Sequence, residues 1–169
     1  MTIDTAVVPF ALGSFRATVD DGVVRGATFD PTPQPARRDA WGVFDIVAAY
    51  FDGDVDALDA LRVDPAGTAF QRAVWKRLRE IPAGSTISYG DLARRVGNPN
   101  ASRAVGMANA SNPITLIVPC HRVVRTGGAI GGYYYGVETK RWLLAHESGA
   151  ATSPRACVGR GQHTLTHAR

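Results

Sequence analysis

A short apolar run that leads directly into three chemically active side chains constrains this chain more than any other feature. Residues 114–118 read ITLIV, and Pro119, Cys120, His121 and Arg122 follow at once. An apolar run of this length is typical of a buried segment. The thiol, the imidazole and the guanidinium are therefore expected beside a core, where polar groups need partners.

Cys120 is either a nucleophile or a buried structural residue. A free cysteine has a pKa of about 8.5 and is only a few per cent thiolate at pH 7. A nucleophile therefore needs a base, for which His121 is adjacent, and a carboxylate such as Glu147 or Asp91 to orient the imidazole. Because neighbouring residues in a strand point to opposite faces, His121 would act through a bend or a bridging water. The residues alone leave both interpretations open.

Length and composition exclude several classes of protein. The 169 residues suffice for one compact domain or two small ones that share a core. Two cysteines, Cys120 and Cys157, are too few for a disulfide framework or a cysteine-rich zinc site, so we expect a cytoplasmic protein without metal or cofactor. The chain has no apolar run of roughly 20 residues and no secretory signal pattern, so we expect no membrane association.

The two parts of the chain differ in charge. Residues 1–66 carry a net charge of −6, whereas residues 67–169 carry +10. The difference favours a polyanion such as nucleic acid as a partner of the second part, although both parts could simply be solvated. Residues 148–169 hold three arginines and no acid, which predicts a flexible basic tail with Cys157 as an incidental thiol.

Residues 1–66 are predicted to form a small α/β domain without evident chemistry. Residues 10–29 alternate between apolar and polar side chains around Asp21-Gly22, which is typical of a β-hairpin. Residues 43–50 have the apolar spacing of a helix, which Gly53 ends.

Residues 67–147 are predicted to form a mostly helical domain. Its first helix begins with a capping box of Thr68 and Gln71 and ends at Pro82. The expected apolar stripe consists of Phe70, Val74 and Leu78, with Trp75 beside it. A last helix covers residues 136–147, anchored by Trp142, Leu143 and Leu144. Glu147 ends that helix where the dipole disfavours an anion, so it either serves a function or is exposed.

Two short helices joined by a tight turn are predicted at the centre of this domain. The first runs from Tyr89 to Val96 with Gly97 as its C-cap, and Asn98 caps the second with Pro99 in its first turn. This order is typical of a helix-turn-helix. The second helix carries many small residues, which would let it approach a neighbouring helix or enter a narrow groove. The small residues are Ala101, Ala104, Gly106, Ala108 and Ala110, and Arg103 is the one long cationic side chain among them.

Several motifs together resemble the O6-alkylguanine-DNA alkyltransferase family. They are IVPCHRVV, SYGDLA, RAVG, NASNP and GGYYYGVETKRWLLAHE, and the resemblance runs from Thr68 to Glu147. The resemblance implies an α/β N-terminal domain like ribonuclease H, followed by a mostly helical C-terminal domain with a winged helix-turn-helix. It implies direct-reversal DNA repair, in which one alkyl group moves irreversibly from O6-alkylguanine, and also O4-alkylthymine, to the protein.

The resemblance also assigns the catalytic roles. Cys120 would accept the alkyl group, His121 would act as base through a water, and Glu147 would hold the imidazole. Asn112 would be a hinge residue that bonds backbone and braces the cysteine turn. The nucleophile is thus the interpretation that the resemblance favours.

The substrate and DNA contacts follow from the same resemblance. Tyr89 would bond the flipped guanine, and Arg103 would fill the space that the base leaves. Tyr133 and the backbone of Tyr134 would line the pocket, and the carbonyls of Cys120 and Val123 would read the exocyclic amine. The residues expected at the DNA minor groove are Ser88, Tyr89, Arg103, Ala104, Gly106 and Ala110. The bulk of Tyr134 and Tyr135 departs from many relatives and should narrow or reshape the pocket.

The expected partner is double-stranded DNA that contains O6-alkylguanine, bound by a monomer or cooperatively. A minor-groove helix suits base flipping, because the target oxygen is inside the stack. Three alternatives are a lesion-binding relative that does not react, a plain helix-turn-helix regulator and a Cys-His-Glu hydrolase. Cys120 argues against the first, a regulator has no need of Pro-Cys-His-Arg, and turnover of a small ester would identify the third.

Overall fold

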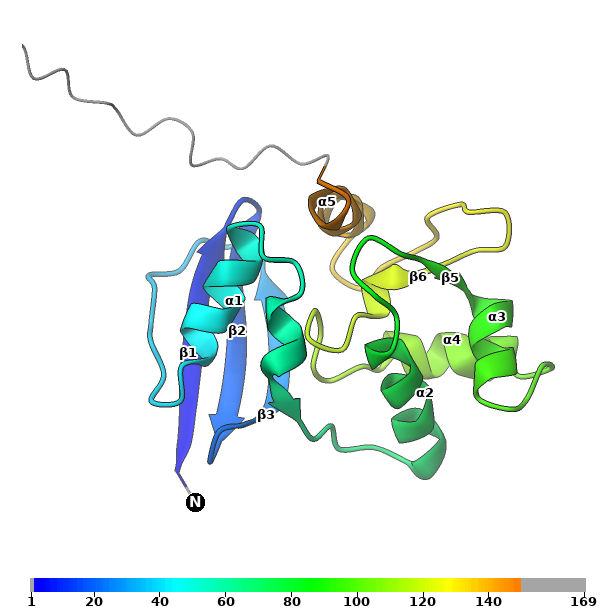
Figure 1. Ribbon diagram of the computed structural model, residues 1–169, viewed down its shortest axis with the longest axis horizontal. Coiled ribbons are helices and arrows are strands. Elements are labelled where there is room, and N and C mark those ends of the chain that lie inside the picture. Colours follow the sequence, from blue (N-terminus) through cyan, green and yellow to red (C-terminus); the bar gives the residue numbers. More distant parts are fainter. Residues whose placement is uncertain (1, 150–169) are drawn as a thin grey trace, which may run out of the picture.

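The computed structural model describes residues 2–149, which form a strand-rich N-terminal unit and a helical C-terminal unit (Figure 1). The last helix, α5 (Val137–Glu147), lies near both units (Figure 1). The described residues include no helix that is long and apolar enough to cross a membrane. The predicted tail lies outside the described residues from position 150 onward, and so does Cys157.

A four-stranded sheet forms the N-terminal unit. Its strands are β1 (Ile3–Phe10), β2 (Gly13–Asp20), β3 (Val23–Asp30) and β4 (Arg62–Val63), in that spatial order. The first three are antiparallel and β4 is parallel to β3. The predicted hairpin is confirmed, because Asp21 and Gly22 both have positive φ between β2 and β3. The strand β1 precedes the predicted hairpin and was not predicted.

The helix α1 (Val43–Phe51) packs on this sheet and confirms the predicted helix. Its side chains Val43, Val47 and Tyr50 are buried, at the spacing expected for one helical face. The short 3-10 helix η1 (Ala57–Ala60) then leads into β4. Tyr50, in the buried last turn of α1, extends to the C-terminal unit, where its hydroxyl donates to Glu147.

The C-terminal unit contains four helices and a pair of short parallel strands among the described residues. In chain order its elements are α2 (Ala69–Arg79), β5 (Ile87–Ser88), α3 (Tyr89–Arg95), α4 (Ser102–Ala110), the 3-10 turn η2 (Cys120–Arg122), β6 (Val123–Val124) and α5. The capping box of α2 is confirmed, since Thr68 Oγ1 accepts from the Gln71 amide at 3.1 Å and Gln71 Oε1 accepts from the Thr68 amide at 2.9 Å.

The apolar face of α2 differs from the predicted stripe. Trp75 belongs to the core, whereas Phe70 is 37% exposed. The reason is tertiary, because Trp75 Nε1 donates a 2.8 Å hydrogen bond to the carbonyl of Ala108. This bond holds the indole against the C-terminal half of α4, which rotates the buried face of α2 toward that helix.

The helix-turn-helix region follows the prediction for its first helix but not for the start of its second. Gly97 has a φ of 83°, as a C-cap glycine requires. The helix α4 begins at Ser102, so Asn98 does not cap it. Instead the Asn98 carbonyl accepts from the Ala101 amide at 3.0 Å, which closes a turn with Pro99 in its second position. Proline is favoured there because its fixed φ suits the turn.

The apolar run 114–118 is buried as predicted, but it forms a tight turn and not a strand. Its amide–carbonyl bonds join Val118 to Ile114 and Ile117 to Thr115, each at 2.9 Å. Leu116 adopts a φ of 70°, a left-handed conformation that costs a non-glycine residue about 1–2 kcal/mol. The surrounding core must offset that cost, and the turn delivers Cys120 to the start of η2.

Candidate active site

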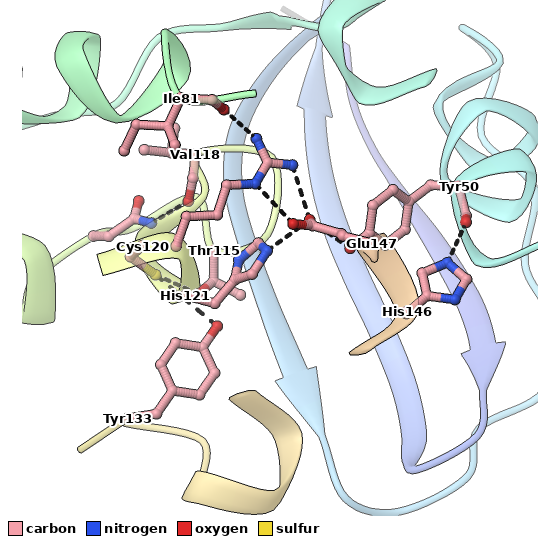
Figure 2. Close-up of polar contacts among 11 residues, drawn as sticks. Tyr50, Ile81, Thr115, Val118, Cys120, His121, Tyr133, His146 and Glu147 are labelled. Atoms are coloured by element: carbon pink, nitrogen blue, oxygen red, sulfur yellow. Dashed lines mark hydrogen bonds and ion pairs between the residues drawn. The ribbon is translucent and has the colours of Figure 1, made fainter. Parts of the chain in front are cut away.

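Cys120 lies at the wall of a cavity of about 510 Å³. Its sulfur is 3.5 Å from Thr115 Oγ1 and 4.0 Å from the hydroxyl of Tyr133 (Figure 2). The side chain is buried and carries a free thiol, and no other cysteine lies within residues 2–149. The cavity wall brings together several residues expected from the sequence: Tyr89, Gly106, Ala110, Asn112, Tyr133, Tyr134 and Tyr135.

His121 is fully buried and bonded to Glu147. Its Nε2 lies 2.7 Å from Glu147 Oε1, whereas its Nδ1 is buried without a hydrogen-bonding partner among residues 2–149 (Figure 2). Because an ionised carboxylate only accepts, Nε2 carries the proton and Nδ1 presents a lone pair. Burial lowers the pKa of His121 although Glu147 opposes that shift, so the imidazole is neutral at pH 7 and can take a proton at Nδ1.

Glu147 is also held by Arg122 and Tyr50. Arg122 donates to it through Nε at 2.9 Å and through Nη2 at 2.8 Å, and the Tyr50 hydroxyl donates at 2.9 Å. Burial alone would raise the pKa of Glu147, but the hydrogen bonds of His121 and Arg122 and the charge of Arg122 outweigh it and keep that pKa well below its usual range. Burial and Glu147 raise the pKa of Tyr50 far above its usual value, so Tyr50 stays a neutral donor.

The other carboxylate considered for orienting the imidazole, Asp91, is engaged elsewhere. It accepts from Ser88 Oγ at 2.7 Å and pairs with Arg94 on the surface. Ser88 itself caps α3, since its Oγ accepts from the Asp91 amide at 3.0 Å. Asp91 was therefore the wrong candidate, and Glu147 is the carboxylate beside His121.

Asn112 braces the turn that carries the cysteine. Its Nδ2 donates to the Val118 carbonyl at 2.7 Å, and its Oδ1 accepts from the Ile114 amide at 3.0 Å. One side chain thus bonds both ends of the buried turn. Its amide suits this place because it offers a donor and an acceptor together.

Lys140 is a buried cation of the site that sequence reasoning missed. Its Nζ donates to the Val123 carbonyl at 2.6 Å and to the Gly132 carbonyl at 3.4 Å. Burial lowers its pKa. A signal was available, because Lys140 precedes the buried Leu143 by three residues and Glu147 by seven, and so shares their helical face. The sequence likewise did not predict that Arg122 and Tyr50 would hold Glu147.

Two neighbouring tyrosines, Tyr134 and Tyr135, contribute to the lip of the cavity. Tyr134 is 83% exposed, so its ring takes up little of the interior. Tyr135 is half-buried, and its hydroxyl lies 3.1 Å from Thr28 Oγ1 on β3. It also packs edge-on against Phe29 at 5.4 Å. The lip of the cavity therefore rests on the N-terminal sheet.

The outer face of α4 is exposed and combines a cation with small side chains. Arg103, Ala104 and Ala110 are exposed there, and Arg103 lies outside the cavity wall. Gly106 faces the ring of Tyr89, at a place where a Cβ would lie 3.8 Å from it. Met107 is 70% exposed on the same face, four residues after Arg103. Met107 was not predicted, although its spacing of four residues from Arg103 places both on one helical face.

A larger cavity, of about 680 Å³, lies on the N-terminal unit between β1, α1 and Trp142. Its wall contains no cysteine and no histidine, so it offers no nucleophile or base of that kind. Among residues 2–149 no group of three or more histidine, cysteine or acidic side chains is placed to hold a metal ion.

Sequence comparison connects the site to one family. Residues 69–149 match the family described as the 6-O-methylguanine DNA methyltransferase, DNA binding domain. A relative named methylated-DNA–protein-cysteine methyltransferase from Shigella flexneri is 51% identical over 106 residues, or 63% of this chain and 62% of the relative. The matched region thus spans less than two thirds of that relative. A protein of the same name from Mycobacterium bovis is 41% identical over 155 residues, covering 89% of this chain and 92% of the relative.

Structure comparison gives the same result over most of the chain. The crystal structure of Mycobacterium tuberculosis OGT in complex with DNA has a TM-score of 0.70 and 34% identity, and covers 87% of this chain and 94% of that one. The O6-methylguanine methyltransferase from the same organism has a TM-score of 0.67 and 36% identity, with 89% and 96% covered. Both units of the chain are therefore matched together.

Proposed function

The chain belongs to the methylated-DNA–protein-cysteine methyltransferase family, and from that premise we propose that it repairs O6-alkylguanine in DNA by moving the alkyl group to Cys120. The observation that carries the proposal is the placement of Cys120 on a cavity wall directly before the buried His121–Glu147 pair. A cysteine kept only for packing would need neither a base nor a cavity.

The chemistry is a single displacement. His121 Nδ1 takes the thiol proton of Cys120 through a bridging water, while Glu147 and Arg122 keep the Nε2 proton in place. The thiolate attacks the alkyl carbon, so the S–C bond forms as the C–O6 bond breaks. The guanine leaves as the normal base and takes up one proton, which balances the proton that His121 removed from the thiol. A thioether is a poor leaving group, so each molecule reacts once.

Lys140 supports the same step electrostatically. It is a buried cation that bonds the carbonyl of Val123, three residues after Cys120. A preorganised positive charge attracts the negative charge that the sulfur carries into the displacement. Tyr133, 4.0 Å from the sulfur, is kept in its neutral donor form because burial raises its pKa far above its usual value.

The proposed DNA contacts use the outer face of α4. A helix with small exposed residues can approach the minor groove closely, and Arg103 would fill the gap that a flipped base leaves. Ser88, Tyr89, Ala104, Gly106 and Ala110 lie on or near that face and complete the proposed DNA surface.

We extend the proposal to the finer architecture and setting. Residues 1–66 are a scaffold domain like ribonuclease H, and residues 67–147 are the DNA-binding and acceptor domain with a winged helix-turn-helix. The antiparallel β1–β3 followed by α1, and the α3–α4 pair beside β5 and β6, support these assignments. The protein acts on DNA as a cytoplasmic monomer.

The direct test is intact-mass measurement after incubation with a duplex that contains O6-methylguanine. We expect each protein molecule to gain one methyl group, located on Cys120 by peptide mapping. Cys120→Ser should gain none but still bind DNA, because affinity depends on phosphate contacts made elsewhere. Uptake by this variant, or at Cys157, would contradict the assignment. Repeated turnover of a small ester would instead support a hydrolase.

A further inference from the structure

Asn109 places an unused hydrogen-bond acceptor at the cavity wall. Its side chain is only 7% exposed and lines the cavity beside Tyr89. Its Nδ2 donates to the Cys120 carbonyl at 3.3 Å, whereas its Oδ1 is buried and has no partner among residues 2–149. A buried acceptor without a partner is costly, so native proteins rarely keep one without a reason.

The orientation of this amide follows from its neighbour. The Cys120 carbonyl can only accept, so the nitrogen of Asn109 must face it. Rotating the amide by half a turn would bring two oxygens together and lose the hydrogen bond. The backbone that carries the reactive cysteine therefore fixes Oδ1 as the acceptor left for another group.

The other buried acceptors without partners do not compete for this role. Three such atoms occur among the described residues: Asp20 Oδ1, Asn109 Oδ1 and His121 Nδ1. His121 Nδ1 is the proposed base, and Asp20 lies on β2 of the N-terminal sheet. Asn109 is the one of these three residues that lines the cavity, and its Oδ1 has no assigned chemistry.

The chemistry of the substrate supplies the missing donor. An O6-alkylguanine carries acceptors at O6, N1, N3 and N7, and its only base-edge donors are the two N–H groups of the 2-amine. The carbonyls expected to read that amine are already in use, since Cys120 accepts from Asn109 and Val123 accepts from Lys140. The Cys120 carbonyl also accepts from the Val123 amide, so both of its lone pairs are engaged, and the Val123 carbonyl keeps one. Asn109 Oδ1 has no hydrogen-bonding partner among residues 2–149.

We propose that Asn109 is a specificity residue whose Oδ1 accepts one N–H of the guanine 2-amine. This inference rests on the proposed function and names how that site recognises its base. An O4-alkylthymine has no such amine and would leave Oδ1 buried and unpaired. A site built to bond one donor discriminates strongly against a base that lacks it.

The test compares two duplexes that differ only in this amine, one with O6-methylguanine and one with O6-methylhypoxanthine. Single-turnover rates are measured for the wild type, for Asn109→Leu, which keeps the size without the amide, and for Asn109→Ala. The two bases differ in how readily they flip, but that difference is the same for every variant. The ratio of the rate on O6-methylguanine to the rate on O6-methylhypoxanthine is therefore compared between wild type and variant. Its change isolates the contact between Asn109 and the 2-amine.

We expect the wild type to prefer the guanine lesion and both variants to lose roughly ten- to a hundredfold of that preference. An equal loss on both substrates would mean that Asn109 only positions Cys120 or Tyr89, and it would overturn the inference. A preference that both variants keep unchanged would overturn it as well. If the wild type methylates Cys120 from neither duplex, the proposed function itself fails, which is a separate outcome.

Discussion

Glu147 is the residue on which the site depends most. It ends α5, where the helix dipole disfavours an anion, yet it is buried. Arg122, His121 and Tyr50 offset both penalties with hydrogen bonds of 2.7 to 2.9 Å. The carboxylate therefore serves two purposes, because it sets the tautomer of His121 and it neutralises a buried arginine.

This double purpose predicts that Glu147→Gln affects folding as well as reaction. Removing one partner of a buried ion pair leaves Arg122 uncompensated and typically costs about 3–5 kcal/mol. We expect urea unfolding to show a loss of that size, and alkyl transfer by the remaining folded protein to slow strongly. DNA affinity at low temperature should change little. An unchanged urea midpoint would mean that Arg122 finds another partner.

The state of His121 predicts how the protein responds to acid. Burial lowers its pKa below 6.5, so the neutral base persists as pH falls to that value and is lost only below it. In the same window the unfolded chain binds a proton that the folded chain does not, so stability also falls as pH decreases below about 6.5. Glu147, with its lowered pKa, adds a further loss below its usual value of 4.5.

Single-turnover rates and thermal midpoints measured from pH 8 to pH 5 would check this. The rate and the thermal midpoint should each be independent of pH near pH 7 and should decrease toward pH 5. A rate that falls with a midpoint above 6.5 would show a histidine stabilised in its charged form, contrary to the burial seen here.

At the scale of elements, α4 and α1 each contribute one side chain that lies outside the cavity of Cys120 but is expected to affect its reaction. Arg103 projects from the exposed face of α4, away from the cavity. Tyr50 projects from α1 into the C-terminal unit, where it bonds Glu147 and where its carbonyl accepts from His146 at 2.6 Å (Figure 2). Neither side chain lines the cavity that contains Cys120.

For α4 the prediction concerns Arg103→Ala. Its contact exists only when the base has flipped, so its loss should raise the cost of flipping by about 1–3 kcal/mol. Repair of duplex DNA should slow roughly ten- to a hundredfold, whereas reaction with a free O6-alkylguanine base should barely change. Single-turnover rates on both substrates test this. Equal losses would show that Arg103 supports the fold and not the flipped state.

For α1 the prediction concerns Tyr50→Phe, which removes one hydroxyl. A hydrogen bond to a charged group contributes about 1.5–3 kcal/mol, so the free energy of unfolding of the variant should fall by that amount. The variant should therefore unfold at a lower urea concentration. Because Glu147 loses a donor, alkyl transfer should also slow, and the pH at which it fails should shift. DNA affinity is the control and should stay constant. A stability loss with an unchanged pH profile would limit Tyr50 to a structural role.

At the scale of the whole molecule, the two units carry opposite charge and share one site. Residues 1–66 have a net charge of −6 and residues 67–169 one of +10. The helix α5 of the C-terminal unit also contacts the N-terminal unit, since Trp142 packs on Phe10 at 5.6 Å while Glu147 bonds His121. The N-terminal unit thus reaches the His121–Glu147 pair through Tyr50.

The charge distribution predicts a strong salt dependence of DNA binding. Each phosphate contact releases counterions, so the logarithm of the affinity should fall linearly with the logarithm of the salt concentration. Removing a phosphate-contacting cation should reduce the slope by about 1. Titrations of an undamaged duplex with Cys120→Ser at several salt concentrations would measure it. An affinity independent of salt would argue against an electrostatic DNA surface.

Much of this protein could be predicted from local sequence signals. The hairpin turn at Asp21-Gly22, the capping box of Thr68 and Gln71, and the helix that ends at Glu147 depend on neighbouring residues, and the structure contains all three. The Pro-Cys-His-Arg run likewise indicated the cysteine and histidine of the proposed site, because a thiol beside an imidazole is a local pattern.

Only the tertiary structure decided how distant residues share the site. Tyr50 and Glu147 are 97 residues apart in the chain, and no periodicity links them. Trp75 is buried where its indole N–H donates to the Ala108 carbonyl, and the run 114–118 forms a turn whose two ends both bond Asn112. The free Oδ1 of Asn109 is visible only once its burial and partners are known. Local patterns set backbone conformation, whereas hydrogen-bond satisfaction in a core depends on every element that meets there.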